Sequence, residues 1–450
     1  MSPLRSFVSA LGLVTALGSL QAAPPLVRLL PEDAPLVFAL NDIPELIKSS
    51  EASPVVKMWN DPQIQRFFAP ALEQLQWEKA MDEFKQQTGY TFPELLKMAR
   101  GEAILGVADF AFLSDAEAQK APPFIVAVDF GSDAEKIEKL LVETSRKQKV
   151  EGKIQLETET YAGETLYVTV SIPAKKEDDA NADDEASQKS REPVPFVWTS
   201  VDGVLLGSPS LATVKSTVDA LKKGGLDSSL ERAPRYVRLQ EQAPGHQVSM
   251  LVHFPSIVPE IEKAIAEKAA EQKQNPLGID PTAVLGILGL TDWEDLYFTG
   301  RLDEDAAINH YGLTYREERG ILKIFGMGSE PFPRPSWIPA KWDTVSTARF
   351  SLKQMFAGLE ETFRALSPAM EGLAQGYLAQ FGKQMNVDIK RDFFGSFGNE
   401  VVQSQFFGSP ATGGAPDILT AEQFYALSLE NAPALTRVID GLKKLGGPGI

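Results

Sequence analysis

Hydrophobic residues along this chain alternate between strand-like and helix-like spacing, and the two kinds of segment follow each other repeatedly. Residues 36–40, LVFAL, form a short apolar run that turns into a helical pattern at about residue 42. The run PFIVAVDF at 123–130 leads directly into an amphipathic helical pattern, which Ser132 and Glu135 open with the S-x-x-E signature of a capping box. The pattern predicts an α+β fold, with helices packed on antiparallel or mixed sheets.

The middle of the chain reads as hairpins and a meander. Two alternating segments meet at Ala162-Gly163, and VPFVWTSVDGVLLG has a turn dipeptide at Asp202-Gly203. The helix that follows is predicted to start with Ser208 as its cap and to end at Gly224. Three further runs predict a three-stranded meander: DLYFTGRL, AINHYGLTY and ILKIFG.

Two segments break the pattern. Residues 173–193 contain acids and bases but no large apolar residue, so we predict a disordered acidic loop. A calcium loop is the less favoured alternative, because it needs ligands at fixed alternation and a glycine at the bend. The Pro-rich segment 329–339 predicts an extended linker between a first unit, 27–328, and a shorter second unit, 340–450.

The sequence of the second unit is similar to the beginning of the first. DTVSTARFSLKQMF, from Asp343, aligns without a gap on DAPLVFALNDIPEL, from Asp33. Helices, a Gly-Glu-like strand start, and a strand with a capped helix then follow in both, with Asn431 as the second cap. Five elements in matching order predict two related α+β units in tandem, of which the second lacks the hairpins and the meander.

These segments also resemble a known family. LLPEDAPLVFALNDIPEL, TGYTFPELLKMARGEAILGV and DGVLLGSPSLATVKSTVDAL look like uncharacterised exported bacterial proteins grouped as a domain of unknown function. The resemblance covers most of 27–325 and, weakly, 337–445. It implies tandem strand-helix units and no established activity.

The N-terminus has the layout of a secretory signal peptide. Arg5 precedes an apolar run from Phe7 to Leu20, and the small residues Ala22 and Ala23 follow. The run is shorter than the roughly 20 residues that span a bilayer, so an uncleaved anchor is the less favoured alternative. We predict a signal peptide at 1–22, with cleavage after Ala22 rather than Ala23, and a periplasmic or secreted bacterial protein.

Charge and composition exclude several functions. The chain has 450 residues and a formal charge of −17, and loss of Arg5 makes the mature charge −18. Such a chain repels nucleic acids and anionic lipid head groups, so no nucleic-acid partner is expected. The absence of cysteine excludes thiol catalysis, disulfides and cysteine metal sites. No second long apolar run follows the first, so no transmembrane segment is expected in the mature chain.

Catalytic motifs are missing from the sequence. It contains neither HExxH nor a phosphate-binding glycine loop nor G-x-S-x-G, so no cofactor or metal is expected. The candidates for catalysis are His253, at the end of a strand, and His310, in the middle of another. Should their strands be neighbours, the two could share a face with a carboxylate such as Glu294 or Asp303. An ordinary hydrogen-bonded histidine is the favoured interpretation of each.

Three other features have both a structural and a functional interpretation. The DWED run at 292–295 could supply paired carboxylates, although a turn before a strand is simpler. Glu102 and Glu400 occupy similar places in the two units, which favours a structural role. The aromatic stripe at 59–77 could form a lipid or partner groove, but buried packing is the favoured interpretation.

The sequence therefore predicts an exported, non-catalytic protein that binds an unknown protein or envelope component or has a structural role at the cell envelope. The alternative is a hydrolase whose site is assembled from scattered residues, with His253 or His310 as the base. The sequence leaves the ligand, any reaction and the oligomeric state open.

Overall fold

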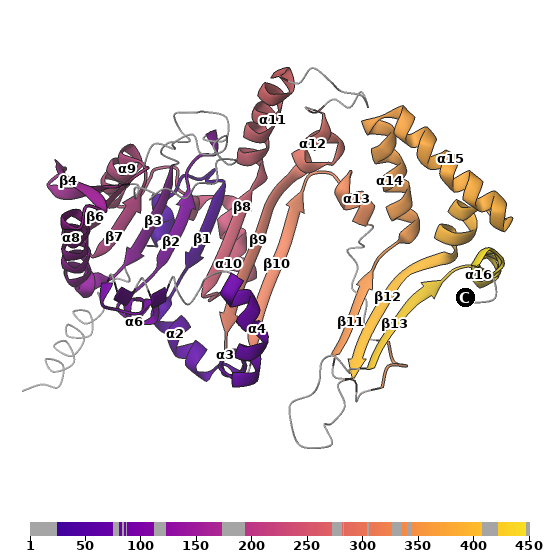
Figure 1. The fold of residues 1–450 in the computed structure, drawn as a ribbon, viewed down its shortest axis with the longest axis horizontal. Helices are drawn as coiled ribbons and strands as arrows, with labels where there is room; N and C mark the ends of the chain where they lie inside the picture. Colours follow the sequence, from indigo (N-terminus) through magenta and orange to yellow (C-terminus); the bar gives the residue numbers. More distant parts are fainter. Residues whose placement is uncertain are drawn as a thin grey trace, which may run out of the picture. The chain divides into compact units, whose positions relative to one another are not determined.

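The computed structural model describes most of the chain as two compact units (Figure 1). The first comprises Met1–Ile261 and Glu294–Thr314, and the second comprises Glu262–Trp293 and Tyr315–Ile450. The described residues are 25–74, 81–82, 85–86, 88–111, 123–172, 194–271, 281, 283–303, 306–325, 335–339, 342, 344–406 and 422–446. The predicted signal peptide, the acidic loop 173–193 and most of the Pro-rich segment 329–339 lie outside these residues, so these features and the linker boundary remain predictions.

A ten-stranded sheet forms the centre of the first unit, in the order β10-β9-β8-β1-β2-β3-β7-β6-β5-β4. Every strand pair whose register is described is antiparallel, which together with the helices gives the predicted α+β class. The strands are β1 (Leu36–Leu40), β2 (Ala103–Val107), β3 (Phe124–Asp129), β4 (Ile154–Tyr161), β5 (Glu164–Ser171), β6 (Pro195–Val201), β7 (Val204–Ser208), β8 (Val248–His253), β9 (Trp293–Leu302) and β10 (Ala307–Tyr315).

Two-residue turns close the two predicted hairpins. Ala162-Gly163 joins β4 to β5, and Asp202-Gly203 joins β6 to β7. All four residues have positive φ, between 49° and 90°. Turns with two left-handed residues match the twist of antiparallel strands, which explains why these dipeptides marked the hairpins in the sequence.

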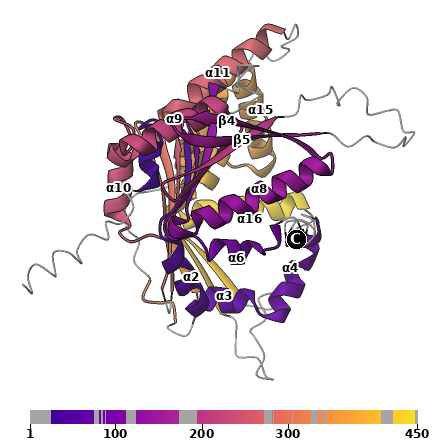
Figure 2. The ribbon, with the colours of Figure 1, turned by 90° about the vertical axis from the view of Figure 1, so that its left-hand side faces the viewer.

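Helices cover both faces of the large sheet. Figure 2 shows α9 and α10 on one side and α6 and α8 on the other. The side of α9 and α10 holds the larger core, which includes Leu30, Ala127, Leu206 and Val218. The other side holds a smaller core around Ile43, Phe130 and Ile137. The helical segments are η1 (Leu26–Leu29), α2 (Ile43–Ala52), α3 (Pro54–Trp59), α4 (Pro62–Gln74), α6 (Phe92–Leu96), η3 (Gly131–Asp133), α8 (Ala134–Val150), α9 (Leu211–Lys223), η4 (Leu230–Arg232), α10 (Pro234–Gln242) and α11 (Phe254–Glu271), of which α11 runs into the second unit.

Two predicted helix caps are wrong. Ser132 lies inside the turn η3 rather than at the start of α8, because Asp129 accepts the Gly131 amide and tightens the chain there. Ser208 is buried at the end of β7, where its Oγ accepts the Ser210 amide, and Ser210 caps α9 instead. The predicted helix end at Gly224 is confirmed by its left-handed conformation.

The predicted meander is also partly wrong. Its first two segments form β9 and β10, but the third is the short helix α13 (Ile321–Phe325). An apolar run of five residues fits either structure, and here α13 packs against α14 of the second unit.

The second unit is built on a three-stranded antiparallel sheet, in the order β11-β12-β13. Asn431 accepts the Ala434 amide at the start of α16, as predicted. The elements are α12 (Val284–Ile287), η5 (Leu290–Asp292), α13, β11 (Thr344–Arg349), α14 (Leu352–Leu366), α15 (Pro368–Met385), the π-helical turn η6 (Ile389–Phe393), η7 (Phe394–Ser396), β12 (Phe397–Phe406), β13 (Glu422–Leu429) and α16 (Ala432–Gly446).

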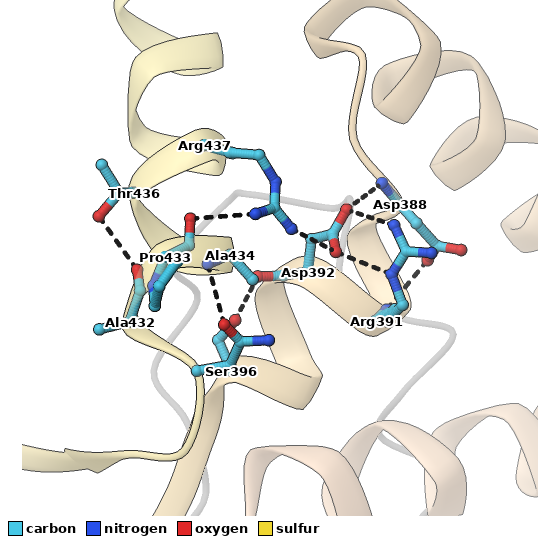
Figure 3. Close-up of polar contacts among 10 residues, drawn as sticks. Asp388, Arg391, Asp392, Ser396, Ala432, Pro433, Ala434, Thr436 and Arg437 are labelled. Carbon is cyan, nitrogen blue, oxygen red and sulfur yellow. Dashed lines mark hydrogen bonds and ion pairs between the residues drawn. The ribbon is translucent and has the colours of Figure 1, made fainter.

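A buried carboxylate joins η6 to α16 (Figure 3). Asp392, 3 % exposed, accepts hydrogen bonds from Arg391 Nε at 2.8 Å and from the Asp388 amide at 2.9 Å. Arg437 of α16 lies 3.3 Å from the same carboxylate. The Arg391 hydrogen bond and the Asp388 amide hold the pKa of Asp392 well below its usual range. The turn before β12 is thus fixed to the last helix by charge as well as by packing.

Candidate functional site

His253, one of the two predicted candidates, contacts a carboxylate in the first unit. It ends β8, and the strand register places it opposite Asp295 of β9. His253 Nδ1 lies 2.8 Å from Asp295 Oδ1. Because a carboxylate accepts, Nδ1 is the donor in this contact, and Nε2 is the ring nitrogen that does not contact Asp295.

Two arginines of α10 surround the same carboxylate. Arg235 Nη1 is 3.5 Å from Asp295 Oδ1, and Arg238 Nη2 is 3.8 Å from Oδ2. Arg235 is buried and also donates to the Glu32 and Ala34 carbonyls, at 2.8 and 2.9 Å. Burial lowers the pKa of Arg235, and the charge of Asp295 opposes that shift. The network therefore ties α10 to β8, β9 and the segment just before β1.

A cavity of about 370 Å³ opens beside this network. Its described lining contains no serine, threonine or lysine, so no hydroxyl or amine nucleophile stands next to His253; the residues are Glu32, Asp33, Ala233, Pro234, Arg235, Arg238, His253, Pro255, Glu294 and Asp295. The arrangement can orient His253 as a base toward a bound water. It equally serves as a structural ion-pair network.

The other predicted residues do not join this site. His310 is exposed on β10, and β9 separates that strand from β8. Glu294 lines the His253 cavity, but Asp303 lies in a different one. Within the DWED run, Asp292 pairs with Arg316 and Arg319, so the two aspartates serve separate networks. Among the described residues, no group of three histidines or carboxylates could hold a metal ion.

A larger cavity, of about 1050 Å³, lies at the other end of β1 and β8 in the first unit, and no sequence motif predicted it. We call it the acid-lined cavity, because six carboxylates line it: Asp42, Glu45, Glu102, Glu231, Glu241 and Asp303. Among the described lining residues, Arg301 is the one arginine or lysine. These residues come from α2 and its cap, the residue before β2, η4, α10 and the residue after β9, which is why no local motif marks them.

Glu102 has the most perturbed carboxylate of this cavity. Its Oε2 accepts the Leu26 backbone N–H at 2.6 Å. Burial raises the pKa of Glu102 to about 7; the Leu26 amide opposes the rise, and the charges of Asp129 and Glu231 add to it. The predicted similarity to Glu400 does not extend to this environment, because Glu400 lies inside β12 opposite Arg349.

His246, in the wall of the same cavity, has an unsatisfied nitrogen. The residue is 6 % exposed, and its Nδ1 lies 2.7 Å from the carbonyl of Ala243, which is not part of the lining. Nδ1 is therefore the donor, and Nε2 is an acceptor that is buried without a hydrogen-bond partner among the described residues. Burial lowers the pKa of His246, which keeps the ring neutral.

The sheet of the second unit has one covered and one open face. On the covered face, Val402 and Ser404 of β12 are buried. On the other, Tyr425, Leu427 and Leu429 of β13 are 59 %, 45 % and 48 % exposed, and β13 is an edge strand. We call this surface the open sheet face.

The aromatic stripe is another exposed apolar surface. Trp59, Phe67 and Phe68 are 41 %, 72 % and 39 % exposed, so the favoured interpretation of buried packing is wrong for these three. Their rings contact one another instead, with Phe68 stacked obliquely on Trp59 and edge-to-face on Phe67. Leu75 and Trp77 lie outside the described residues.

Comparisons of the chain with protein-family models, with curated proteins and with solved structures find no match. None of the helices in the described part of the chain has the length and apolar character needed to cross a membrane.

Proposed function

We propose that this chain is an exported, non-catalytic protein that binds another protein of the cell envelope, in the periplasm or outside the cell. The export signal in the sequence supports the location. The observation that carries the binding role is the exposure of Tyr425, Leu427 and Leu429 on the edge strand β13. An apolar row on a sheet edge is a surface that a partner strand can pair with and cover.

The first unit indicates what such a partner looks like. There β3 pairs with β7 along Val126–Asp129, and helices cover the same face. By analogy, the partner supplies an antiparallel strand with apolar side chains on one face. Glu422 begins β13 and Glu430 follows it, and both are exposed, so the partner strand carries lysine or arginine at its ends.

The test compares variants of the full chain as bait for envelope extracts. Leu427→Lys places a charge on the open sheet face, and Val150→Lys does so at an 89 % exposed residue of α8. We expect one defined protein to be retained by the wild type and by Val150→Lys but released by Leu427→Lys. The recovered protein is then purified and titrated against all three baits.

Equal binding by Leu427→Lys, or no specific binding by the wild type, contradicts the proposal. If the wild-type chain instead forms a concentration-dependent dimer, and Leu427→Lys abolishes that dimer, the partner of the open sheet face is a second copy of the chain.

A second candidate function is hydrolysis at His253. The observation that favours it is the His253–Asp295 pair beside a cavity with two arginines. Here His253 Nε2 would take a proton from a bound water, and Arg238 would stabilise the negative charge that develops. Loss of an esterase or phosphatase activity in both His253→Ala and Asp295→Asn would support it, and unchanged turnover in His253→Ala would exclude it.

We further propose that the two units arose by duplication. The antiparallel orders β1-β2-β3 and β11-β12-β13, each with a helix after its first and third strand, support this origin. A solved structure in which residues 33–150 and 343–446 fail to superimpose would exclude it.

A further inference from the structure

We propose that the helical hairpin formed by α3 (Pro54–Trp59) and α4 (Pro62–Gln74) binds the surface of a phospholipid bilayer that contains anionic lipids. We call this segment the α3–α4 hairpin. Figure 2 shows both helices at the margin of the first unit, below α6 and α8. The open sheet face belongs to the second unit, so either binding surface can exist without the other.

The α3–α4 hairpin presents large apolar side chains to solvent. Four of them are exposed and belong to neither core of the first unit: Met58, Trp59, Phe67 and Phe68. Amphipathic helices with tryptophan and phenylalanine on their apolar side are typical of segments that lie in the interface of a bilayer. A lipid surface covers such side chains without needing a cavity to receive them.

Local contacts hold these side chains in place. Gln65 Nε2 donates to the Trp59 carbonyl at 2.7 Å, and Asp61 accepts the Gln63 amide at 2.7 Å, which fixes the turn between the helices. The centroid of the Phe68 ring lies 5.3 Å from that of Trp59 and 5.1 Å from that of Phe67. The apolar surface is therefore formed before a partner arrives, which lowers the entropic cost of binding.

Charge complementarity selects an anionic surface. Lys57 lies two residues before Trp59, and Arg66 directly precedes Phe67. Both cations are exposed, and neither has an ion pair with the described residues. Asp61, the acid between them, is engaged as the cap of α4. The open sheet face differs, because glutamates lie at the two ends of β13.

The acidity of the whole chain limits this binding without preventing it. The formal charge of −17 opposes the approach to an anionic surface. At physiological ionic strength, however, exposed charges more than about 8 Å apart are largely screened from each other. A lysine or arginine at the lipid surface favours binding about fivefold. The two cations of the hairpin therefore act at contact, where more distant acids do not.

The experiment is vesicle flotation of the mature chain at about 0.15 M salt. Removal of residues 1–22 takes away none of the described residues, which begin at 25, and it removes the apolar run that would enter a bilayer by itself. One set of vesicles contains phosphatidylcholine alone, and the other an equal mixture of phosphatidylcholine and phosphatidylglycerol. We expect the mixed vesicles to bind about tenfold more tightly or better.

A matched pair of variants tests the apolar contact. Phe67→Asp on α4 and Tyr377→Asp on α15 each place one negative charge at an aromatic position that is 72 % exposed. Phe67→Asp should weaken binding to the mixed vesicles about tenfold or more, and Tyr377→Asp should leave it unchanged. Brominated lipid should quench tryptophan fluorescence in the wild type, and Trp59→Phe, which keeps an apolar ring, should lose that quenching.

A second pair of variants tests the charges. Lys57→Gln/Arg66→Gln should weaken binding to the mixed vesicles about tenfold or more and leave binding to phosphatidylcholine unchanged. Arg146→Gln/Lys147→Gln removes the same charges from exposed positions of α8 and should change neither. Because all the replaced side chains lie at the surface, every variant should melt at the temperature of the wild type.

Four results would overturn the proposal. They are no flotation of the wild type with mixed vesicles, equal flotation of Phe67→Asp and Tyr377→Asp, equal effects of the two charge variants, and undiminished quenching in Trp59→Phe. A hairpin that binds an acidic protein instead of lipid would leave both kinds of vesicle unbound, which is the first of these results.

Discussion

The turn that leads into β2 and the turn that leads into β12 use the same kinds of residue to redirect the chain, but different contacts stabilise them. In the first unit, Gly89 in a left-handed conformation precedes the cap Thr91 and the short helix α6. In the second, Asn386 is left-handed, and the cap Asp388 and the turn η6 follow at the same spacing. Gly101, just before β2, and Gly398, at the start of β12, each lie against a side chain of the next strand, which leaves no room for a Cβ.

The anchoring of the two regions differs. Thr91 and Glu94 form an exposed capping box that involves only their own turn. In the turn before β12, by contrast, the buried Asp392 accepts a hydrogen bond from Arg391 and forms an ion pair with Arg437 of α16. A ten-stranded sheet covered on both faces stabilises the first unit, whereas the second has three strands and an open sheet face. The comparison teaches that recurring turn chemistry fixes the path of the chain, while long-range contacts decide how much each turn contributes to stability.

The largest difference in the free energy of unfolding is expected for substitutions at matched positions of β3 in the first unit and β13 in the second. Ile104 pairs with Ala127 in the first unit, and Val401 pairs with Leu427 in the second. Ala127 is fully buried and Leu427 is 45 % exposed. Ala127→Lys should cost more than about 4 kcal/mol because it buries a charge, whereas Leu427→Lys should cost less than about 0.5 kcal/mol. Soluble yield and thermal melting by circular dichroism measure both, and similar melting temperatures would contradict the comparison.

Removal of the buried carboxylate should have the next largest effect. Asp392→Ala should destabilise the second unit by about 2 kcal/mol, because it removes hydrogen bonds to a charged, buried group. Since the folded pKa of Asp392 is lowered, this stabilisation is complete above the unfolded pKa of about 4 and is lost as the pH falls further. Hydrogen exchange of 386–396 and 432–446 reports the change, and protection equal to the wild type there would argue against the network.

The two regions should also differ in their dependence on pH. Glu102 follows Gly101 in the first region, whereas the neutral Asn399 follows Gly398 in the second. Because the folded pKa of Glu102 is raised to about 7, its stabilising contribution is present below about pH 4.5 and is lost as the pH rises to about 7.

Glu102→Gln keeps an acceptor for the Leu26 amide and removes the loss of stability that ionisation of Glu102 causes. The variant should therefore be more stable than the wild type at pH 8 by about 1–3 kcal/mol and equal to it at pH 4.5. Urea unfolding at both pH values measures the difference. An equal difference at both values would exclude the titration of Glu102 as its cause.

The smallest effects are expected at the two caps. Thr91→Ala should cost about 0.5–1 kcal/mol, because α6 is exposed and only its own turn depends on the cap. Asp388→Ala should cost about 1–2 kcal/mol, because the same turn carries the Asp392 network. Urea unfolding of the two variants compares them, and a larger loss for Thr91→Ala would reverse the comparison.

Local chemistry explains what could be predicted from the sequence. The turns at Ala162-Gly163 and Asp202-Gly203 and the helix end at Gly224 depend on their own residues, and each was predicted. The errors at Ser132 and Ser208 arose where a neighbouring side chain or a buried strand end displaced the expected cap. The fold of 321–325 depended on packing against α14, which the sequence does not indicate.

Sites that depend on distant pairing were less predictable. His253 was identified as a candidate, but its partner Asp295 follows only from the register of β8 and β9. The acid-lined cavity combines residues from separate parts of the first unit's sequence, and each of its carboxylates looks like an ordinary surface acid in isolation. Exposure of the aromatic stripe could not be foreseen either, because helical spacing predicts a common face without saying what covers it.

The central position of β1 in the large sheet has a consequence for the order of folding. Leu36 of β1 pairs with Val107 of β2 on one side and with Val252 of β8 on the other. One of the two partner strands of β1 is therefore synthesised more than two hundred residues later. Long closures of this kind slow the search for the native state, whereas the three-stranded sheet assembles from one contiguous stretch, 344–429. A nascent chain therefore cannot pair both edges of β1 until β8 has been synthesised.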